Sequence, residues 1–403
     1  MRVRRPVRVA SLASAAVLGL AAVAGCSASE VLPGGDGAGG PSSQEGGAAP
    51  ASTAPRLRTT PERGARDVPV DTRPSVGIEG GGELREVTLT SPQGAVAGRM
   101  DDNAWIATGS LEPGTAYTLT MTADGADGAE QRTTSRFTTQ DLTLDQQTFA
   151  SIAPLDGETV GVGMPVSVAF DVPVTDRASI EKHLRVTSTP QQAGSWHWFS
   201  DTEVRWRPEE YWKPGTEVTV DADINSVAAG EGIYGQESRR IGFTVGSSVI
   251  HRVDVAAHRM RTFIDGELAR TMPISAGKGG FETRSGTKVI MEKHRTKTMD
   301  AATTGIQPGD PEYYNISDVE YALRVTNSGE FLHAAPWSVG SQGSDNVSHG
   351  CVGMSTEDAA WVYENSKRGD VVEVTGTDRA MTVDNGWGDW NESYDQYAEG
   401  SAL

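Results

Sequence analysis

The sequence predicts a mainly β protein of several domains, and three observations support this fold class. Among 403 residues, 47 are Gly and 20 are Pro, which favours short strands and turns over a helical bundle. Apolar and polar residues alternate over short runs, a period typical of strands. At ~100 to 200 residues per domain, this length corresponds to two to four domains with separate cores.

The charge balance excludes two classes of protein. The chain has 35 Lys and Arg against 54 Asp and Glu, a formal net charge of −19. Nucleic-acid binders concentrate Lys and Arg in order to displace counterions from phosphates, so we exclude nucleic acid as a partner. A chain with this much charge is also not a membrane-embedded body.

The N-terminus has the pattern of an export signal. Residues 1–8 contain four arginines and no acid, and residues 9–25 form an apolar run that ends at Cys26. The run is shorter than the ~20 residues of a bilayer span, and its layout predicts a secretory signal peptide at 1–25. Residues 23–26, VAGC, resemble a bacterial lipobox, which implies that Cys26 carries a diacylglycerol anchor. The alternative is cleavage at an Ala-rich position with an unmodified Cys26.

A flexible linker is predicted between this signal and the first domain. From residue 27 to residue 65, 25 of 39 residues are Gly, Ser, Ala or Pro, without an apolar period that could build a core. We therefore assign residues 26–65 to the lipidated Cys and a tether.

Two similar modules follow, at residues 66–140 and 141–246. The tetrapeptide EPGT at 112–115, followed by alternating residues, recurs as KPGT at 213–216. Short alternating runs between Gly, Pro, Asp and Asn, in units of about 100 residues, are typical of immunoglobulin-like β-sandwiches. The second module also contains Trp196, Trp198, Trp206 and Trp212. A sugar-binding face is one interpretation, but large aromatics dominate core burial, so we favour a packed core.

The last third does not contain a phosphate loop or a metal site. Dense alternation starts near Val249, with Asp265 and Gly266 as a hairpin turn. The segment SAGKGG at 275–280 lacks the first Gly of a phosphate loop, since Met272 occupies that position. The seven His are scattered and no Cys cluster exists, so we assign no metal and no cofactor.

Cys351 is a candidate nucleophile. If Cys26 is lipidated, Cys351 has no partner in an exported chain, and its neighbours are Ser, His and Gly, unlike those of an inert core Cys. A thiol of pKa ~8.5 is activated by a nearby imidazole, which raises the reactive thiolate fraction. His349 would share a face with Cys351 on an extended segment, whereas His333 would have to be brought in by the intervening loop. The spacing alone leaves the base undecided between these two histidines.

The backbone around Cys351 suits an acyl-transfer site. Residues 355–358, STED, predict a capped helix start, so Cys351 lies on a short strand-to-helix connection. Successive N–H groups of His349, Gly350 and Cys351 could form an oxyanion hole there.

At these residues the sequence resembles a known family. Residues 333–355, HAAPWSVGSQGSDNVSHGCVGMS, are similar to the active-site signature of the L,D-transpeptidases, bacterial cell-wall enzymes with an all-β catalytic fold. Residues 275–278 with 285–286 resemble an earlier block of the family's pattern, and the resemblance covers about 247–376. Tandem sandwiches, a lipobox and an aromatic tail at 377–403 look like mycobacterial-type members. The resemblance implies two immunoglobulin-like domains followed by an L,D-transpeptidase β-sandwich with a short helix.

The resemblance also implies roles for single residues. Cys351 would be the nucleophile and His333 its general base, oriented by the Ala334 carbonyl. The backbone of His349, Gly350 and Cys351 would supply the oxyanion donors, and Ser348 and Trp337 would line the substrate cleft. Tyr314 would be the lid tyrosine, with Tyr313 and Tyr321 as alternatives. The chain departs from the family at Gly353, where members usually have Asn or Arg, and at Ala334, where many have Ser.

The function implied by this resemblance is peptidoglycan cross-linking. A donor stem peptide would acylate Cys351 with loss of D-alanine, and an amine of an acceptor stem would resolve the thioester into a link between two diaminopimelate residues. Carbapenem-type inhibitors would acylate the same sulfur, and no cofactor is needed. The expected location is the extracytoplasmic face of the membrane, anchored by lipid and reaching into the cell wall. The alternatives are an L,D-carboxypeptidase that hydrolyses the same thioester and a non-catalytic wall-binding lipoprotein.

Overall fold

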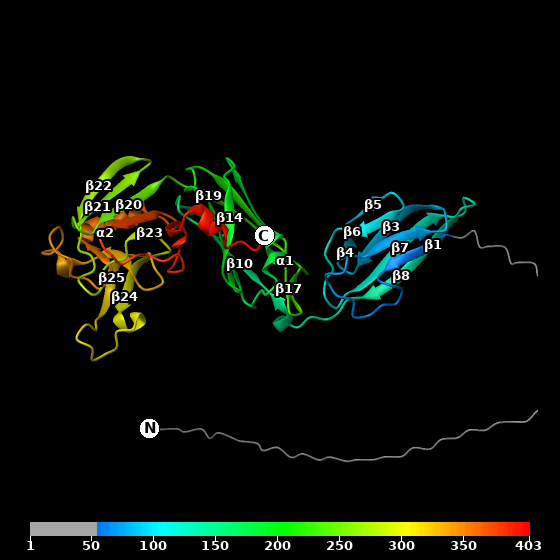
Figure 1. Ribbon diagram of the computed structural model, residues 1–403, viewed down its shortest axis with the longest axis horizontal. Helices are drawn as coiled ribbons and strands as arrows, with labels where there is room; N and C mark the ends of the chain where they lie inside the picture. Colours follow the sequence, from blue (N-terminus) through cyan, green and yellow to red (C-terminus); the bar gives the residue numbers. More distant parts are fainter. Residues whose placement is uncertain (1–54) are drawn as a thin grey trace, which may run out of the picture. The chain divides into compact units, whose positions relative to one another are not determined.

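The computed structural model describes residues 55–403. Residues 1–54, with the predicted signal peptide, Cys26 and most of the predicted linker, lie outside the described residues. No helix within 55–403 has the length and apolar character needed to cross a bilayer. Strands dominate the described chain, as predicted (Figure 1).

The first sandwich packs two four-stranded sheets. One has the order β1(Arg56–Thr60), β2(Ser75–Glu79), β6(Ala104–Ala107), β5(Gly98–Asp101), and the other β4(Gly94–Val96), β3(Glu83–Ser91), β7(Ala116–Asp124), β8(Glu130–Thr138). Alternate residues of β7, including Tyr117 and Leu119, are buried between them.

The predicted domain boundary at residue 66 needs correction. Strand β1 starts at Arg56, inside the segment that composition assigned to the linker, and pairs antiparallel with β2 over its whole length. An edge strand of this kind is held mainly by backbone hydrogen bonds, so its side chains give no strong apolar period. Composition therefore placed the boundary too late.

The second sandwich is built around tryptophans. Its main sheets are β10(Ala150–Ala153), β12(Val166–Phe170), β15(Glu203–Pro208), β14(Gly194–Ser200), and β11(Thr159–Val160), β19(Arg239–Val245), β16(Glu217–Ala222), β13(Leu184–Thr189). Smaller elements are η1(Leu144–Gln146), β9(Gln147–Thr148), α1(Arg177–Glu181), β17(Ala228–Gly230) and β18(Ile233–Gly235). Trp196, Trp198, Trp206 and Trp212 are all buried in its core, which confirms the core interpretation over an exposed sugar-binding face.

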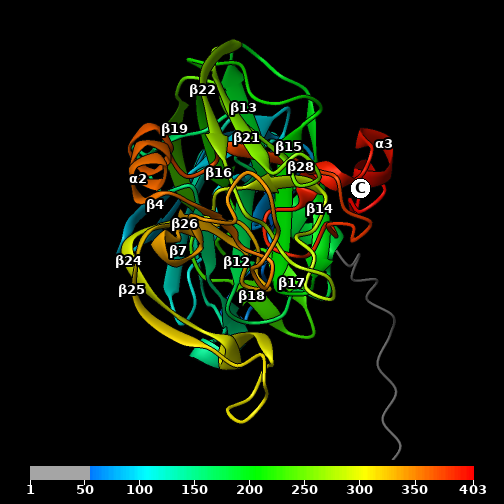
Figure 2. The same cartoon turned by 90° about the vertical axis from the view of Figure 1, so that its left-hand side faces the viewer.

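The third domain also consists of two sheets. The first has the order β22(Glu267–Pro273), β21(Arg259–Ile264), β20(Val249–Asp254), β28(Val371–Thr375), β23(Gly286–Val289). The second has the order β24(Glu292–Asp300), β25(Asn315–Arg324), β26(Phe331–Ala334), β27(Val352–Met354), with η2(Ala301–Thr304), η3(Pro336–Ser338) and α2(Thr356–Asn365) beside it. Asp265 and Gly266 both have positive φ in the β21–β22 turn, which confirms the predicted hairpin. The long β24–β25 hairpin extends from the rest of this domain in both views, with residues 301–314 at its tip (Figure 2).

The aromatic tail packs onto the second sandwich as well as onto the third domain. It contains η4(Asp389–Asn391) and α3(Tyr394–Ala398), which lies beside β14 (Figure 2). The Trp390 indole N–H donates to the Gly163 carbonyl (2.9 Å), and Asn391 Nδ2 donates to the Thr287 carbonyl of β23 (2.6 Å). The tail therefore contacts both the second sandwich and the third domain.

Candidate active site

One cavity of about 200 Å³ brings most of the predicted site residues together. It lies at the end of β26 and β27, between the lid segment at residues 301–314 and the connection at 335–351. Its lining includes Cys351, His333, Tyr314, Ser348, His349, Trp337 and Gly353. Because the lining also includes Ser275, residues separated by up to 78 positions in the chain share one surface.

The parallel pairing of β26 with β27 explains how His333 and Cys351 come together. His333 lies opposite Gly353 in this register, so Cys351 immediately precedes the paired segment on the neighbouring strand. The chain between the two strands returns over the cavity and carries Trp337, which is about half exposed with its ring 5.8 Å from the His333 ring. The strand register thus brings His333 to the cavity of Cys351 without any local sequence signal.

His333 has the geometry of a neutral general base. Its side chain is buried, and Nδ1 lies 2.7 Å from the Ala334 carbonyl oxygen. A carbonyl only accepts hydrogen bonds, so Nδ1 carries the proton and Nε2 keeps its lone pair. Burial lowers the pKa of His333 below its usual 6.5, which keeps the imidazole neutral near pH 7.

Cys351 is a protonated thiol in this structure. Cys351 is 8% exposed, and its Sγ donates to the Gly329 carbonyl oxygen (3.6 Å) rather than to His333. Burial raises the pKa of Cys351 to about 12, because the low-dielectric surroundings disfavour a thiolate. Thiolate formation in this site therefore requires a proton acceptor, and His333 lines the same cavity.

The turn before Cys351 restricts which backbone donors can serve an oxyanion. The Gly350 N–H donates to Ser348 Oγ (3.1 Å), and Ser348 Oγ donates to the Cys351 carbonyl (2.6 Å). Gly350 has φ +122°, a conformation that favours glycine, and its carbonyl accepts from Thr283 Oγ1 (2.8 Å). Because the Gly350 N–H is already engaged, the amides of His349 and Cys351 remain as the candidate donors.

His349 is engaged by a residue that the sequence analysis did not identify. Its Nε2 donates to Glu312 Oε2 (2.7 Å), and the same oxygen accepts from Lys278 Nζ (2.5 Å). Glu312 belongs to the lid, 37 residues before His349, and nothing in the sequence pairs these two positions. This arrangement favours His333 over His349 as the base, because the His349 ring is held by the lid.

Of the three tyrosines considered, Tyr314 is the one that lines the cavity. Its ring lies 5.0 Å from the His349 ring, and burial, followed by the nearby Cys351, raises its pKa to about 12. Tyr321, by contrast, packs against Tyr363 of α2 at 5.7 Å, and Tyr313 is not among the cavity residues.

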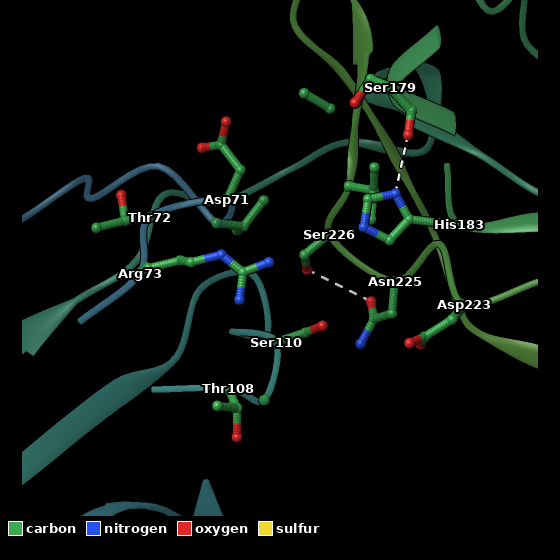
Figure 3. A pocket seen from close by; sticks show the side chains of 14 residues that line it. Asp71, Thr72, Arg73, Thr108, Ser110, Ser179, His183, Asp223, Asn225 and Ser226 are labelled. Carbon is green, nitrogen blue, oxygen red and sulfur yellow. Dashed lines mark hydrogen bonds between the residues drawn. The ribbon is translucent and has the colours of Figure 1, made fainter. Parts of the chain in front are cut away.

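A second cavity, of about 230 Å³, lies away from Cys351. It is lined by residues 70–73 and 108–110 of the first sandwich and by residues of the second, including 223–228 (Figure 3). His183 on its wall is held by the Ser179 carbonyl at 2.8 Å. None of its lining residues belongs to the third domain, so we assign it no part in the chemistry at Cys351.

Comparisons with known proteins agree with this site. Residues 248–374 match the L,D-transpeptidase catalytic domain, and residues 65–228 match the bacterial Ig domain. L,D-transpeptidase 2 of Mycobacterium tuberculosis is 38% identical over 86% of this chain and 85% of its own length. The chain belongs to the L,D-transpeptidase family. L,D-transpeptidase 5 of the same species is 34% identical over 87% of this chain and 78% of its own length. A solved L,D-transpeptidase in complex with imipenem is 38% identical, with a TM-score of 0.50 over 57% of this chain and 99% of the other.

The L,D-transpeptidase fold accommodates Gly353 for a steric reason. A Cβ at this position would lie 2.8 Å from the Ala335 Cβ, closer than carbon atoms approach without a shift. The catalytic connection is braced by other contacts instead: Gly353 pairs with Ser275 through two backbone hydrogen bonds of 2.9 Å, and Gln342 Nε2 donates to the Ala335 carbonyl (3.0 Å). Contacts from Ser275 and Gln342 thus hold the chain around Gly353.

Proposed function

We propose that this protein is a peptidoglycan L,D-transpeptidase that works through a thioester on Cys351. The observation that carries the proposal is the shared cavity of His333 and Cys351, with the imidazole buried, neutral and free at Nε2. A substrate carbonyl entering this cavity would meet a nucleophile, a base and backbone donors from one continuous turn. The donor is a stem tetrapeptide that ends in diaminopimelate and D-alanine.

The first half-reaction forms the acyl-enzyme. Nε2 of His333 takes the thiol proton as Sγ of Cys351 attacks the carbonyl carbon of the diaminopimelate L-centre, and a tetrahedral oxyanion forms. The amides of His349 and Cys351 stabilise the negative oxygen. Collapse breaks the C–N bond, His333 returns the proton to the leaving amine, and D-alanine departs.

The second half-reaction transfers the acyl group. An amine of the acceptor stem attacks the thioester, its proton passes to His333, and the C–S bond breaks to regenerate the thiol. The product is an amide between two diaminopimelate residues. If water replaces the amine, the product is a tripeptide stem, which is the carboxypeptidase alternative.

Product analysis tests this proposal against both alternatives. We expect the purified protein, incubated with disaccharide tetrapeptides, to give cross-linked dimers by mass spectrometry and to release D-alanine. The Cys351→Ala variant should give neither product. Tripeptide without dimers would favour hydrolysis, and unchanged substrate with wall binding retained would favour the non-catalytic alternative.

We further propose a lipid anchor at Cys26 and a place outside the cytoplasm. The support is the charged, apolar and small-residue order of residues 1–25 and the VAGC sequence at 23–26. A thioether-linked diacylglycerol would hold the domains at the membrane, where two acyl chains give stable anchoring. Labelling the full-length chain with a clickable fatty acid in a bacterial host tests this: the label should be present on the natural chain and absent from Cys26→Ala.

A further inference from the structure

A buried cluster of charges lies under the turn that carries Cys351. Lys288 of β23 is 1% exposed, and its Nζ pairs with Glu330 Oε2. Glu330, 3% exposed, also accepts at Oε1 from Arg284, through Nη1 (2.8 Å) and the backbone N–H (3.2 Å). One cation, Lys288, and one carboxylate, Glu330, are thus enclosed in the interior, where an unpaired charge is strongly unfavourable, while the Arg284 side chain at the edge of the cluster is 18% exposed.

This cluster touches the nucleophile's own turn. A Cβ placed on Gly350 would lie 3.5 Å from Glu330 Cγ and 3.6 Å from Glu330 Oε1, so the carboxylate packs directly against Gly350. Gly329, the residue before Glu330, supplies the carbonyl that accepts from Cys351 Sγ. The charge on Glu330 is therefore close to the sulfur in space.

The fields of the two partners act on the sulfur in opposite directions. Burial has the largest effect and raises the pKa of Cys351, and a backbone hydrogen bond at Phe331 lowers it. Of the two charged partners, the Glu330 carboxylate raises this pKa and the Lys288 ammonium lowers it. The other titratable groups that line the cavity with the sulfur are His333 on β26, whose lowered pKa keeps it neutral, Tyr314 of the lid, whose pKa of about 12 leaves it neutral, and His349, which is hydrogen-bonded to Glu312. Among the charged groups near the sulfur, the Lys288 cation opposes the effect of the Glu330 carboxylate on the pKa of Cys351.

We propose that Lys288 is a positioning residue for the nucleophile: by neutralising Glu330 beneath the Gly350 turn, it prevents a buried carboxylate from opposing thiolate formation at Cys351. Arg284 shares the carboxylate at its other oxygen and fixes its orientation. The inference rests on the proposed function only in taking Cys351 as the reactive thiol. Lys288 itself touches no reacting atom, so its effect acts through Glu330.

The test is the pH dependence of Cys351 alkylation in the full chain. Iodoacetamide is the probe, and the modified peptide is quantified by mass so that Cys26 does not interfere. We expect Lys288→Gln, which keeps a hydrogen-bond donor but loses the charge, to slow alkylation at pH 7 by about tenfold, as a rise of one pKa unit would. The double variant K288Q/E330Q, which has lost both charges, should recover to within about threefold of the natural chain.

The matched control is Arg295→Gln, which removes the cation of an exposed ion pair with Glu320 on the second sheet of the same domain and should leave the rate unchanged. Equal slowing in K288Q and K288Q/E330Q would overturn the proposal, since a purely structural role predicts no recovery. If K288Q does not fold, as judged by circular dichroism, Glu330→Gln decides: alkylation at least as fast as in the natural chain supports the proposal, and a tenfold loss contradicts it. Because alkylation needs no stem peptide, failure of this test is distinct from failure to form cross-links.

Discussion

His333 determines the acid limit of the proposed reaction. Burial lowers its pKa below 6.5, so the imidazole stays neutral and able to accept a proton until the pH falls through that lowered value. We therefore expect the acid limb of the kcat/KM profile for D-alanine release to have its midpoint below pH 6.5. His333→Asn should lose about 10²- to 10⁴-fold in rate, the usual contribution of a general base. An acid limb centred above pH 6.5, or a variant with nearly full activity, would contradict this role.

Gly353 tests the steric account of the departure from the family pattern. Gly353→Asn would push a Cβ to 2.8 Å from the Ala335 Cβ, so we expect a loss of about 1–3 kcal/mol in the free energy of unfolding. Gly340→Asn is the matched control, because Gly340 lies in the same connection and a Cβ added there would meet no atom within 4 Å, so this change should be neutral. Denaturant titration measures both, and equal stabilities would remove the steric explanation.

The lid is held closed by one carboxylate at the tip of the β24–β25 hairpin. A hydrogen bond from Lys278 has the largest effect on the pKa of Glu312 and lowers it, and one from His349 lowers it further. The carboxylate therefore stays ionised through the usual titration range of a Glu. Its hydrogen bonds to Lys278 and His349 are lost only as the pH falls through the lowered pKa. Glu312→Gln should accelerate hydrogen exchange in residues 305–314, measured by mass spectrometry. Glu320→Gln, on the same hairpin but in an exposed pair, serves as the control. Unchanged hydrogen exchange in E312Q would show that the hydrogen bonds of Glu312 with Lys278 and His349 do not hold the lid in place.

The elements differ in how far the sequence predicts them. The β21–β22 hairpin and the cap of α2 follow from local patterns, since Asp265–Gly266 suits positive φ and Ser355 Oγ accepts from the Asp358 N–H (3.1 Å). The pairing of Glu312 with His349, and of Lys288 with Glu330, arises only when distant strands come together, so no local pattern indicates it. The composition of residues 56–60 does not indicate strand β1 for a related reason, because this segment becomes a strand through its backbone pairing with β2.

A buried ion pair fixes the tail to the second sandwich. Arg205 of β15 contacts Asp389 (3.3 Å) and the Gly386 carbonyl (2.7 Å), and the Tyr397 hydroxyl donates to Asp389 (2.9 Å). Asp389→Asn leaves the Arg205 charge only partly compensated, so we expect a loss on the order of 3 kcal/mol in stability by urea titration. The exposed Asp395 of α3 provides the control, and Asp395→Asn should change little. If D389N and the natural chain had the same free energy of unfolding, the contact between Arg205 and Asp389 would contribute nothing to stability.

The whole chain can be described as a catalytic domain joined to two sandwiches, with its proposed chemistry concentrated at one sulfur. The sequence signature located Cys351 and His333, while the structure supplied the tautomer of the base, the protonated state of the thiol and the contacts of the lid. These features depend on burial and strand register, which a single sequence does not contain.

The most direct test of the central claim is the intact mass of the full chain after incubation with imipenem, the carbapenem bound to one of the similar proteins. We expect one covalent adduct, mapped to the peptide that contains Cys351, on the natural chain and none on Cys351→Ala. A natural chain of unchanged mass, or an adduct that persists in the variant, would contradict the assignment of Cys351 as the nucleophile.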